Sequence, residues 1–265
     1  MSKRLPIAAA VLSWLVMAQT HAQWDSYERM TAQSLRAAIT QSPSGTRPEL
    51  TGKNLSGLDL TEVDFRAANL SASVLNGAKL TRARLDRTNL TVSFLEGADL
   101  TGASLRNAMM FSVQLAGGTL RDADLSGARL IGDLRKADLT QANLTHMNAA
   151  ADMRNQSMGL MRANIVNAKA PRADFSNSDF SRADFSFTDL SDARLVGTKL
   201  VRADFSGANL SGADLTGADL RESQVTDTDL SRANLTNADF TGASFQGVRG
   251  LDTAITAGAR GLPQN

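Results

Sequence analysis

The sequence predicts an all-β solenoid, in which the chain winds into stacked coils. A large apolar residue recurs at every fifth position from Leu55 to Leu130, and again from Leu160 to Phe245 with Ala170 as its one small member. A small residue stands two places before nearly all of these positions, and Ser, Thr or Gly often follows. An internal repeat of this kind is the strongest single indicator of a fold.

A period of five excludes the regular elements on geometric grounds. Five residues of an α-helix advance by about 500°, so successive large residues would form no apolar stripe. In a straight strand they would alternate between the two faces. A coil that turns a corner in every repeat can point all of them inward, with hydrogen bonds joining coils ~4.8 Å apart.

Residues 1–22 are expected to be a secretory signal peptide. A basic start precedes an apolar run over residues 5–18, and the small residues Thr20 and Ala22 precede Gln23. The run is shorter than the ~20 residues of a membrane span, although an uncleaved anchor is the alternative. We expect cleavage between Ala22 and Gln23, a periplasmic or secreted location, and no stable membrane insertion.

Charge and cysteine content narrow the function further. The leader holds two basic and no acidic side chains, so its removal changes the net charge from +1 to −1. That balance argues against nucleic-acid binding and against strong mimicry of nucleic acid. The chain contains no cysteine, so it has no disulfide and must be held by burial alone.

The ends of the solenoid need covers. Residues 23–50 are expected to form an N-terminal cap and linker, with a helix over 24–40 that begins at a capping box of Asp25 and Glu28. The repeat is expected over 51–250. In the tail, 251–265, Leu251 is expected to pack on the last coil and the remainder to loosen. The helix residues expected to face the first coil are Tyr27, Met30, Leu35, Ala38 and Ile39.

The repeat unit carries a family resemblance. Its form A(D/N)LXX, seen as "ANLSG", "ADLTG" and "ADFSR", resembles the pentapeptide repeat family over roughly residues 51–250. The resemblance implies a right-handed quadrilateral β-helix with four pentapeptides per coil. Residues 20 apart would then stack, giving the outward charge alternation Asp59, Lys79, Asp99. The same rule gives one internal column of Phe185, Phe205, Val225 and Phe245.

The rhythm breaks once, in an irregular coil at 131–159. Leu130 is followed by Leu134, one residue early, and Leu160 is back in the first phase. Residues 145–159 are either a bulged coil filled by methionines, which the unchanged final phase favours, or a loop that protrudes to a partner. The methionines are Met147, Met153, Met158 and Met161.

Two outward groups depart from the polar pattern of the repeat. The first is apolar, and is either a partner surface or local packing at a distorted corner: Val74, Val92, Phe94, Met109, Phe111 and Ile131. The second is a column of Arg162, Arg182 and Arg202. It is either an anion-contacting site or part of an Arg–Asp lattice. Like charges this close repel each other unless they are paired, which favours the lattice.

No catalytic or metal-binding pattern is visible. His146 is the one histidine after the leader, and without cysteine it cannot build a zinc site. We therefore expect no enzyme, no cofactor and no metal. The chain lacks the long apolar tail helix with which some relatives dimerise, which favours a monomer.

Two functions follow. The first is a non-catalytic, exported binding or scaffold protein of the cell envelope, with a protein partner. The alternative, implied by the resemblance, is a DNA-mimicking protein that binds a type II topoisomerase. Such proteins are cytoplasmic and strongly acidic, whereas this sequence has an expected signal peptide and a near-neutral charge.

Overall fold

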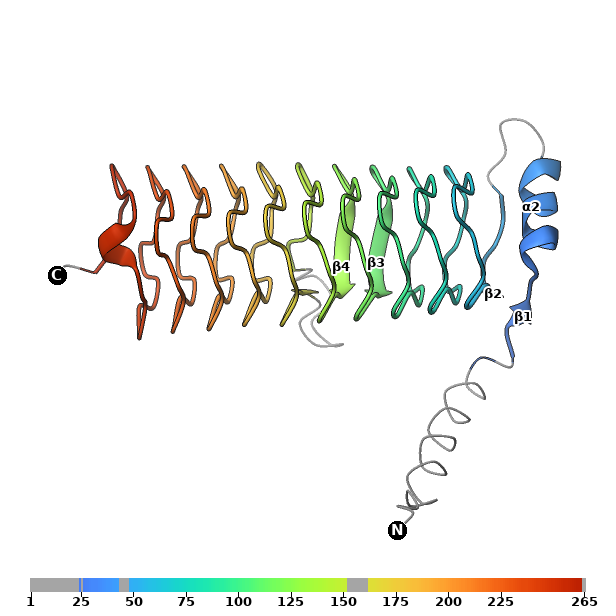
Figure 1. The fold of residues 1–265 in the computed structure, drawn as a ribbon, viewed down its shortest axis with the longest axis horizontal. Coiled ribbons are helices and arrows are strands. Elements are labelled where there is room, and N and C mark those ends of the chain that lie inside the picture. Colours follow the sequence, from blue (N-terminus) through green and yellow to red (C-terminus); the bar gives the residue numbers. More distant parts are fainter. Residues whose placement is uncertain (1–23, 25, 43–47, 152–161, 264–265) are drawn as a thin grey trace, which may run out of the picture.

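The protein is a rod of stacked coils, seen from the side in Figure 1. The computed structural model describes residues 24, 26–42, 48–151 and 162–263. Parallel backbone bridges join each coil to the next, and in the regular part they pair residues 20 apart, such as Asp59 with Lys79. The 20-residue coil expected from the resemblance is observed. The elements with names are β1 (Glu28–Arg29), α2 (Ala32–Gln41), β2 (Lys53–Asn54), β3 (Met109–Gln114), β4 (Arg129–Asp133), β5 (Ala163–Asn164) and the 3-10 turn η2 (Leu251–Thr253).

The coil turns at the residue two places after each large apolar one. Arg82 is an example, with φ at 54° and its N–H donating to the Thr101 carbonyl of the next coil at 2.9 Å. This left-handed conformation carries no steric cost for glycine, which explains why Gly is common at this place in the repeat.

The Asp or Asn of the repeat has a local role in the same turn. Asp99 Oδ1 accepts a hydrogen bond from the Thr101 N–H at 3.0 Å and another from the Thr101 hydroxyl at 2.6 Å. The carboxylate thus closes the turn that follows the core residue, as short polar side chains do in Asx turns. The pattern of Asp or Asn, then a large residue, then Ser or Thr is one hydrogen-bonded unit.

The core lies inside the coils. The large apolar residues are fully buried along nearly the whole rod, and so are the small residues two places before them. The expected aromatic column is present at Phe185 and Phe205, whose rings stack with centroids 5.1 Å apart and planes within 3°. Hydroxyls at small positions donate to carbonyls, as Thr188 does to Ile165 at 2.7 Å. Such bonds satisfy most polar atoms inside the coil, although the buried Ser223 hydroxyl has no hydrogen-bond partner.

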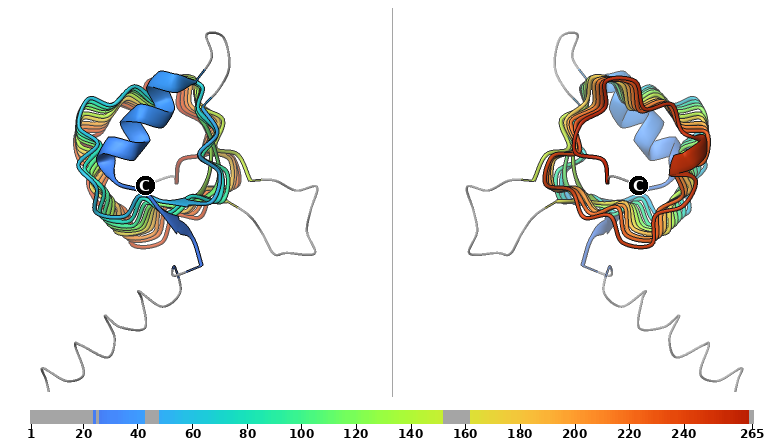
Figure 2. Two further views of the ribbon diagram at one scale, coloured as in Figure 1. Left: turned by 90° about the vertical axis from the view of Figure 1, so that its right-hand side faces the viewer. Right: turned by 90° about the vertical axis from the view of Figure 1, so that its left-hand side faces the viewer.

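The N-terminal helix is shorter than expected. It begins after Thr31, whose side chain and that of Ser34 form the capping box, whereas Glu28 belongs to strand β1. β1 pairs in parallel with β2. The first coil has a backbone edge with unpaired N–H and C=O groups. Two residues of extended chain can hydrogen-bond to these groups, whereas a further helical turn would bond only within itself. Leu35 is fully buried, and α2 lies across the end of the rod in Figure 2.

The tail does not loosen after Leu251, contrary to expectation. Ile255 bridges Asn234 and Arg260 bridges Asp239, so the ladders continue with 21 residues in this last turn of the chain. η2 absorbs the one extra residue. Leu251 packs against the core as expected, and so does Leu262.

Candidate functional site: an interrupted corner

Departures from the regular repeat gather at one corner of the rod. In successive coils this corner follows Leu90, Met110, Leu130, Ala149 and Phe180. We call it the interrupted corner. The residues on it that the argument uses are Val92, Phe111, Ser112, Ile131, Arg182, Arg202 and Glu222.

One residue is missing from the interrupted corner after Leu130. Phe111 of β3 pairs with Ile131 of β4. Two places later, Val113 pairs with Gly132, so Ser112 forms a bulge with no residue opposite. The ladders beyond this point pair residues 19 apart, as the early return of the rhythm predicted.

The next coil is eleven residues too long at the same corner. Asp138 pairs with Lys169, 31 residues later, against 20 in a regular coil. Ala151 still belongs to the coil, because its N–H donates to the Ser181 carbonyl at 3.2 Å. Ala163 belongs to it again, within β5. The extra residues therefore lie between Ala151 and Ala163.

The interpretation of 145–159 as a bulged coil is wrong for the part that the structure describes. Met147 and Ala149 are buried in register, so residues up to 151 follow the regular path. The excess of eleven and the deficit of one together amount to two whole repeats, which is why the sequence returns to its first phase. The other methionines, Met153, Met158 and Met161, lie outside the described residues.

The apolar cluster divides into covered and exposed members. Met109 is 53% exposed and Val92 46%, and Phe111 is partly exposed beside them. The expectation that Val74 and Ile131 are exposed is wrong, because both are buried. Ile131 turns inward because the corner residue that would follow it is missing.

Phe94 is covered by the chain itself. The ring of Trp24 packs on it, with centroids 4.4 Å apart, and Tyr27 packs edge-on against Trp24 at 5.5 Å. Val74 lies in the ladder between Asn54, where β1 pairs, and Phe94. The segment from Trp24 to β1 therefore crosses Val74 as well. Sequence reasoning missed this contact of Trp24, although the residue is an aromatic one at the start of the helix expected over 24–40.

A shallow groove opens where the corner is short. Its volume is about 280 Å³, and it is lined by Ser112, Gln114, Ile131, Gly132, Asp133, Arg162 and Asn164. Of these, only Ile131 and Arg162 were singled out from the sequence, because the others occupy ordinary repeat positions. Gly132 stands where other coils have an inward Ala, Ser or Val, and that substitution was a signal available in the sequence.

The arginine column is largely an ion-pair lattice. Arg162 Nη2 lies 2.6 Å from Asp184 Oδ2, and Arg202 Nη2 lies 2.6 Å from Glu222 Oε2. Arg202 lowers the pKa of the Glu222 carboxyl by hydrogen bonding, and Arg182 lowers it further by its charge. Two of the three guanidinium groups are therefore neutralised within the chain, which favours the lattice over an anion-contacting site.

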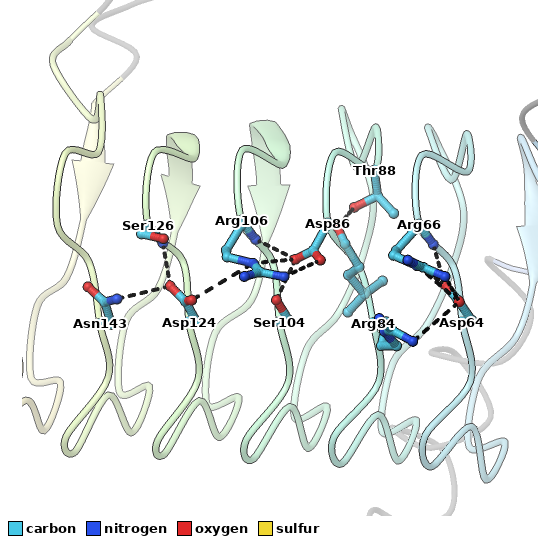
Figure 3. Close-up of polar contacts among 11 residues, drawn as sticks. Asp64, Arg66, Arg84, Asp86, Thr88, Ser104, Arg106, Asp124, Ser126 and Asn143 are labelled. Carbon is cyan, nitrogen blue, oxygen red and sulfur yellow. Dashed lines mark hydrogen bonds and ion pairs between the residues drawn. The ribbon is translucent and has the colours of Figure 1, made fainter.

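A second lattice covers the face drawn in Figure 3. Arg66 contacts Asp64 at 2.5 Å, and Arg106 reaches back one coil to Asp86 at 2.8 Å. Ser104 also donates to the Asp86 carboxylate. These partners account for the charges of this face within the fold.

Acid is expected to weaken the rod through Asp86. The hydrogen bond from Arg106, with a second from Ser104, lowers the pKa of the Asp86 carboxyl from 3.8 to about 2. Because the folded pKa lies below the unfolded one, this stability is present above about pH 4 and is lost as the pH falls toward about 2. Asp86→Asn should lack that dependence and lose about 1 kcal/mol at neutral pH, a value reduced by screening at the half-exposed Arg106.

The measurement is urea unfolding of both proteins from neutral pH to pH 3. Asp252→Asn, which removes an exposed carboxylate of η2, is the control and should follow the unaltered protein. Parallel pH profiles for the unaltered protein and Asp86→Asn would contradict the prediction.

The candidate residues for metal binding are not brought together among the residues that the structure describes. His146 is exposed and occupies a turn, with φ at 57°. Within the same residues, no three His, Cys, Asp or Glu side chains are placed to share a metal ion. No helix among them has the length and apolarity needed to cross a bilayer.

Comparison with known proteins identifies the repeat. The family model for pentapeptide repeats matches in eight copies, over residues 54–91, 93–127, 119–149, 160–195, 188–227 and 218–249. The chain belongs to the pentapeptide repeat family. Family membership implies a right-handed β-helical solenoid, in agreement with the parallel ladders. Curated proteins gave no significant match.

Two solved pentapeptide repeat proteins illustrate the likeness. HetL, involved in heterocyst differentiation regulation in the cyanobacterium Nostoc sp. strain PCC 7120, is 27% identical, with 87% of this chain and 96% of HetL covered and a TM-score of 0.50. Full-length QnrB1, a plasmid-mediated fluoroquinolone resistance protein, is 16% identical, with coverages of 78% and 90% and a TM-score of 0.41. The TM-score of the QnrB1 match is too low to support any argument about function.

Proposed function

We propose that this pentapeptide repeat protein is a non-catalytic binding or scaffold protein of the cell envelope, and that it binds a protein partner at the interrupted corner. The observation that carries the proposal is the coincidence of three departures at that corner. They are the exposed apolar side chains, the missing residue with its groove, and the eleven extra residues.

The rest of the surface supports this assignment by contrast. Outward positions elsewhere are mostly polar, and their charges are paired within the chain, as Arg106 is with Asp86. Such a lattice keeps a rod soluble and offers a partner little apolar area. A protein partner needs a desolvated centre, and Val92, Met109 and Phe111 supply one beside the groove.

The finer features of the fold belong to the same proposal. We take the rod to be quadrilateral in section, which the four sets of ladders support, and α2 to be its N-terminal cap, which the burial of Leu35 supports. A covered end leaves the sides of the rod for binding. Topoisomerase binding remains the alternative from the family resemblance, and no observation on this fold favours it.

Export is the second part of the proposal and rests on the leader. A basic start, an apolar run over residues 5–18 and small residues before Gln23 are typical of a cleaved signal peptide. N-terminal sequencing of protein recovered from the envelope should read Gln23-Trp24-Asp25. A chain that begins at Met1 and stays in the cytoplasm would overturn this part and leave the alternative standing.

Substitution at the interrupted corner tests the binding role. Phe111→Asp should weaken cross-linked capture of the envelope partner by ~1–3 kcal/mol, the usual cost of losing an aromatic anchor. Phe187→Asp is the matched control, because Phe187 is 64% exposed on a different corner and lies over Gly207. It should capture the partner like the unaltered protein.

Two readings of that experiment contradict the binding role. One is an equal loss in both variants. The other is full capture by Phe111→Asp with an unchanged melting temperature, which would show that the exposed apolar side chains are incidental.

A further inference from the structure

Within the segment from Trp24 to Arg29, β1 pairs with the edge of the first coil, but Trp24 lies further along, over Phe94 on the side of the rod, where the fold does not need a cover. The end of the rod is already closed by α2, with Leu35 fully buried. In the ladder that the segment crosses, the outward residues of the other coils are polar, as Asn54 and Gln114 are. Only Val74 and Phe94 are apolar, and the segment crosses these two.

The contacts of this segment describe the ligand that the surface accepts. Its backbone pairs in parallel with β2, Glu28 opposite Lys53 and Arg29 opposite Asn54. The Glu28 carboxylate forms an ion pair with Lys53. Four residues upstream of Glu28, the Trp24 ring packs at a tilt against Phe94. An extended peptide with an aromatic residue and, four places later, an acidic one satisfies all three contacts.

The segment is held lightly compared with the coils. β1 has two residues, both exposed, and the Glu28 side chain is 70% exposed. Directly after β1, the Met30 N–H donates to the Asn54 carbonyl of β2 at 3.1 Å. Short elements with few buried contacts open locally at low free-energy cost, well below that of global unfolding.

We propose that the surface formed by Lys53, Asn54, Val74 and Phe94 is a peptide-binding cleft, which the segment 24–29 occupies in cis and from which a partner peptide of the same chemistry displaces it. The inference rests on the proposed binding role and adds the kind of partner. β-Strand addition gives such a peptide its backbone bonds, and the aromatic ring gives it an anchor. The tethered segment has an effective concentration in the millimolar range, so a free peptide of equal affinity competes poorly with it, and a partner displaces it by binding the surface more tightly.

A labelled peptide tests the cleft directly. The probe is QWDSYERM, the sequence of residues 23–30, with a fluorescent dye at its carboxyl end. By fluorescence anisotropy it should bind the full chain carrying Trp24→Ala at least tenfold more tightly than the unaltered chain. The same peptide with alanine in place of its tryptophan should lose that advantage. Phe94→Asp added to Trp24→Ala should also remove it.

A disulfide lock supplies the second measurement. The chain has no cysteine, so Arg29→Cys with Asn54→Cys places one new pair at opposed positions of β1 and β2. In the Trp24→Ala background, the oxidised protein should exclude the probe, and reduction should restore binding. Circular dichroism melting shows that each variant is folded.

The outcomes separate this inference from the proposed function. Absence of probe binding to folded Trp24→Ala, or binding that Phe94→Asp and the disulfide leave unchanged, overturns the cleft. Neither result bears on Phe111, whose role is measured by partner capture. If capture requires Phe111 but an excess of the probe peptide does not reduce it, the binding role stands and the cleft takes no part in it.

Discussion

Leu215→Ala is expected to lower the free energy of unfolding by ~2–5 kcal/mol. Leu215 is completely buried, and its N–H donates to the Asn234 carbonyl of the next coil at 2.8 Å. Hydrogen bonds on both sides of each coil fix the backbone, so the coils cannot move inward to fill the space of the lost side chain. The cavity remains, and its cost adds to the lost burial.

The adjacent residue provides the control. The Asp214 side chain faces outward, but its Oδ1 accepts from the Thr216 N–H at 3.1 Å and from the Thr216 hydroxyl at 2.6 Å. Asp214→Ala should therefore cost about 1 kcal/mol or less, and Asp214→Asn, which keeps an acceptor oxygen, less still. Urea unfolding followed by circular dichroism measures all three variants. Equal losses at 214 and 215 would mean that the inward register is wrong.

Gly132→Ala is expected to be among the most disruptive single substitutions in the chain. A Cβ at Gly132 would overlap the Val113 carbonyl oxygen and lie 2.9 Å from the Val113 nitrogen. Both are backbone atoms of β3 at the position that pairs with Gly132, so neither can retreat without disturbing the ladder between β3 and β4. We expect a loss of at least ~2 kcal/mol, in the upper part of the range for overpacking.

Gly217→Ala is the matched control. Gly217 has φ at 65°, but nothing lies within 4 Å of a Cβ placed there. Only the left-handed strain remains, about 1 kcal/mol, and Arg202 and Asp192 already adopt the same conformation in this chain. The melting temperatures of the two variants are compared, because Gly132→Ala reports the cost of close packing and Gly217→Ala the cost of backbone strain alone. If Gly132→Ala melts no earlier than Gly217→Ala, the close approach of β3 and β4 at this corner is wrong.

The interrupted corner shows why the candidate site could be predicted only in part. The early return of the rhythm at Leu134 was visible in the sequence, and so was the unusual apolar character of Val92 and Phe111. That the shortened coil and the lengthened one meet at the same corner depends on which residues pair across coils. Spacing alone is equally consistent with a bulge distributed along 145–159, and that interpretation was wrong.

Which outward side chains are buried could not be predicted from the sequence either. Val74 and Phe94 occupy equivalent positions and read as equally exposed. Their cover is Trp24 with the chain that leads to β1, seventy residues earlier than Phe94 in the sequence. A repeat pattern describes how each residue stands relative to its own coil, and it carries no information on what a segment outside the repeat places over it.

The sequence by itself determined the solenoid and its inward and outward residues, and the stacking of residues 20 apart followed only from the family resemblance. It could do so because each five-residue unit holds its own instructions: a core residue, a small residue beside it, and an Asp or Asn that closes the next turn. Only the tertiary structure decided that residues 28–29 form a strand rather than a helix, and that the chain after Leu251 keeps to the ladder. These outcomes depend on the free backbone edges of the first and last coils, and an edge becomes available to a segment only once the coils are stacked.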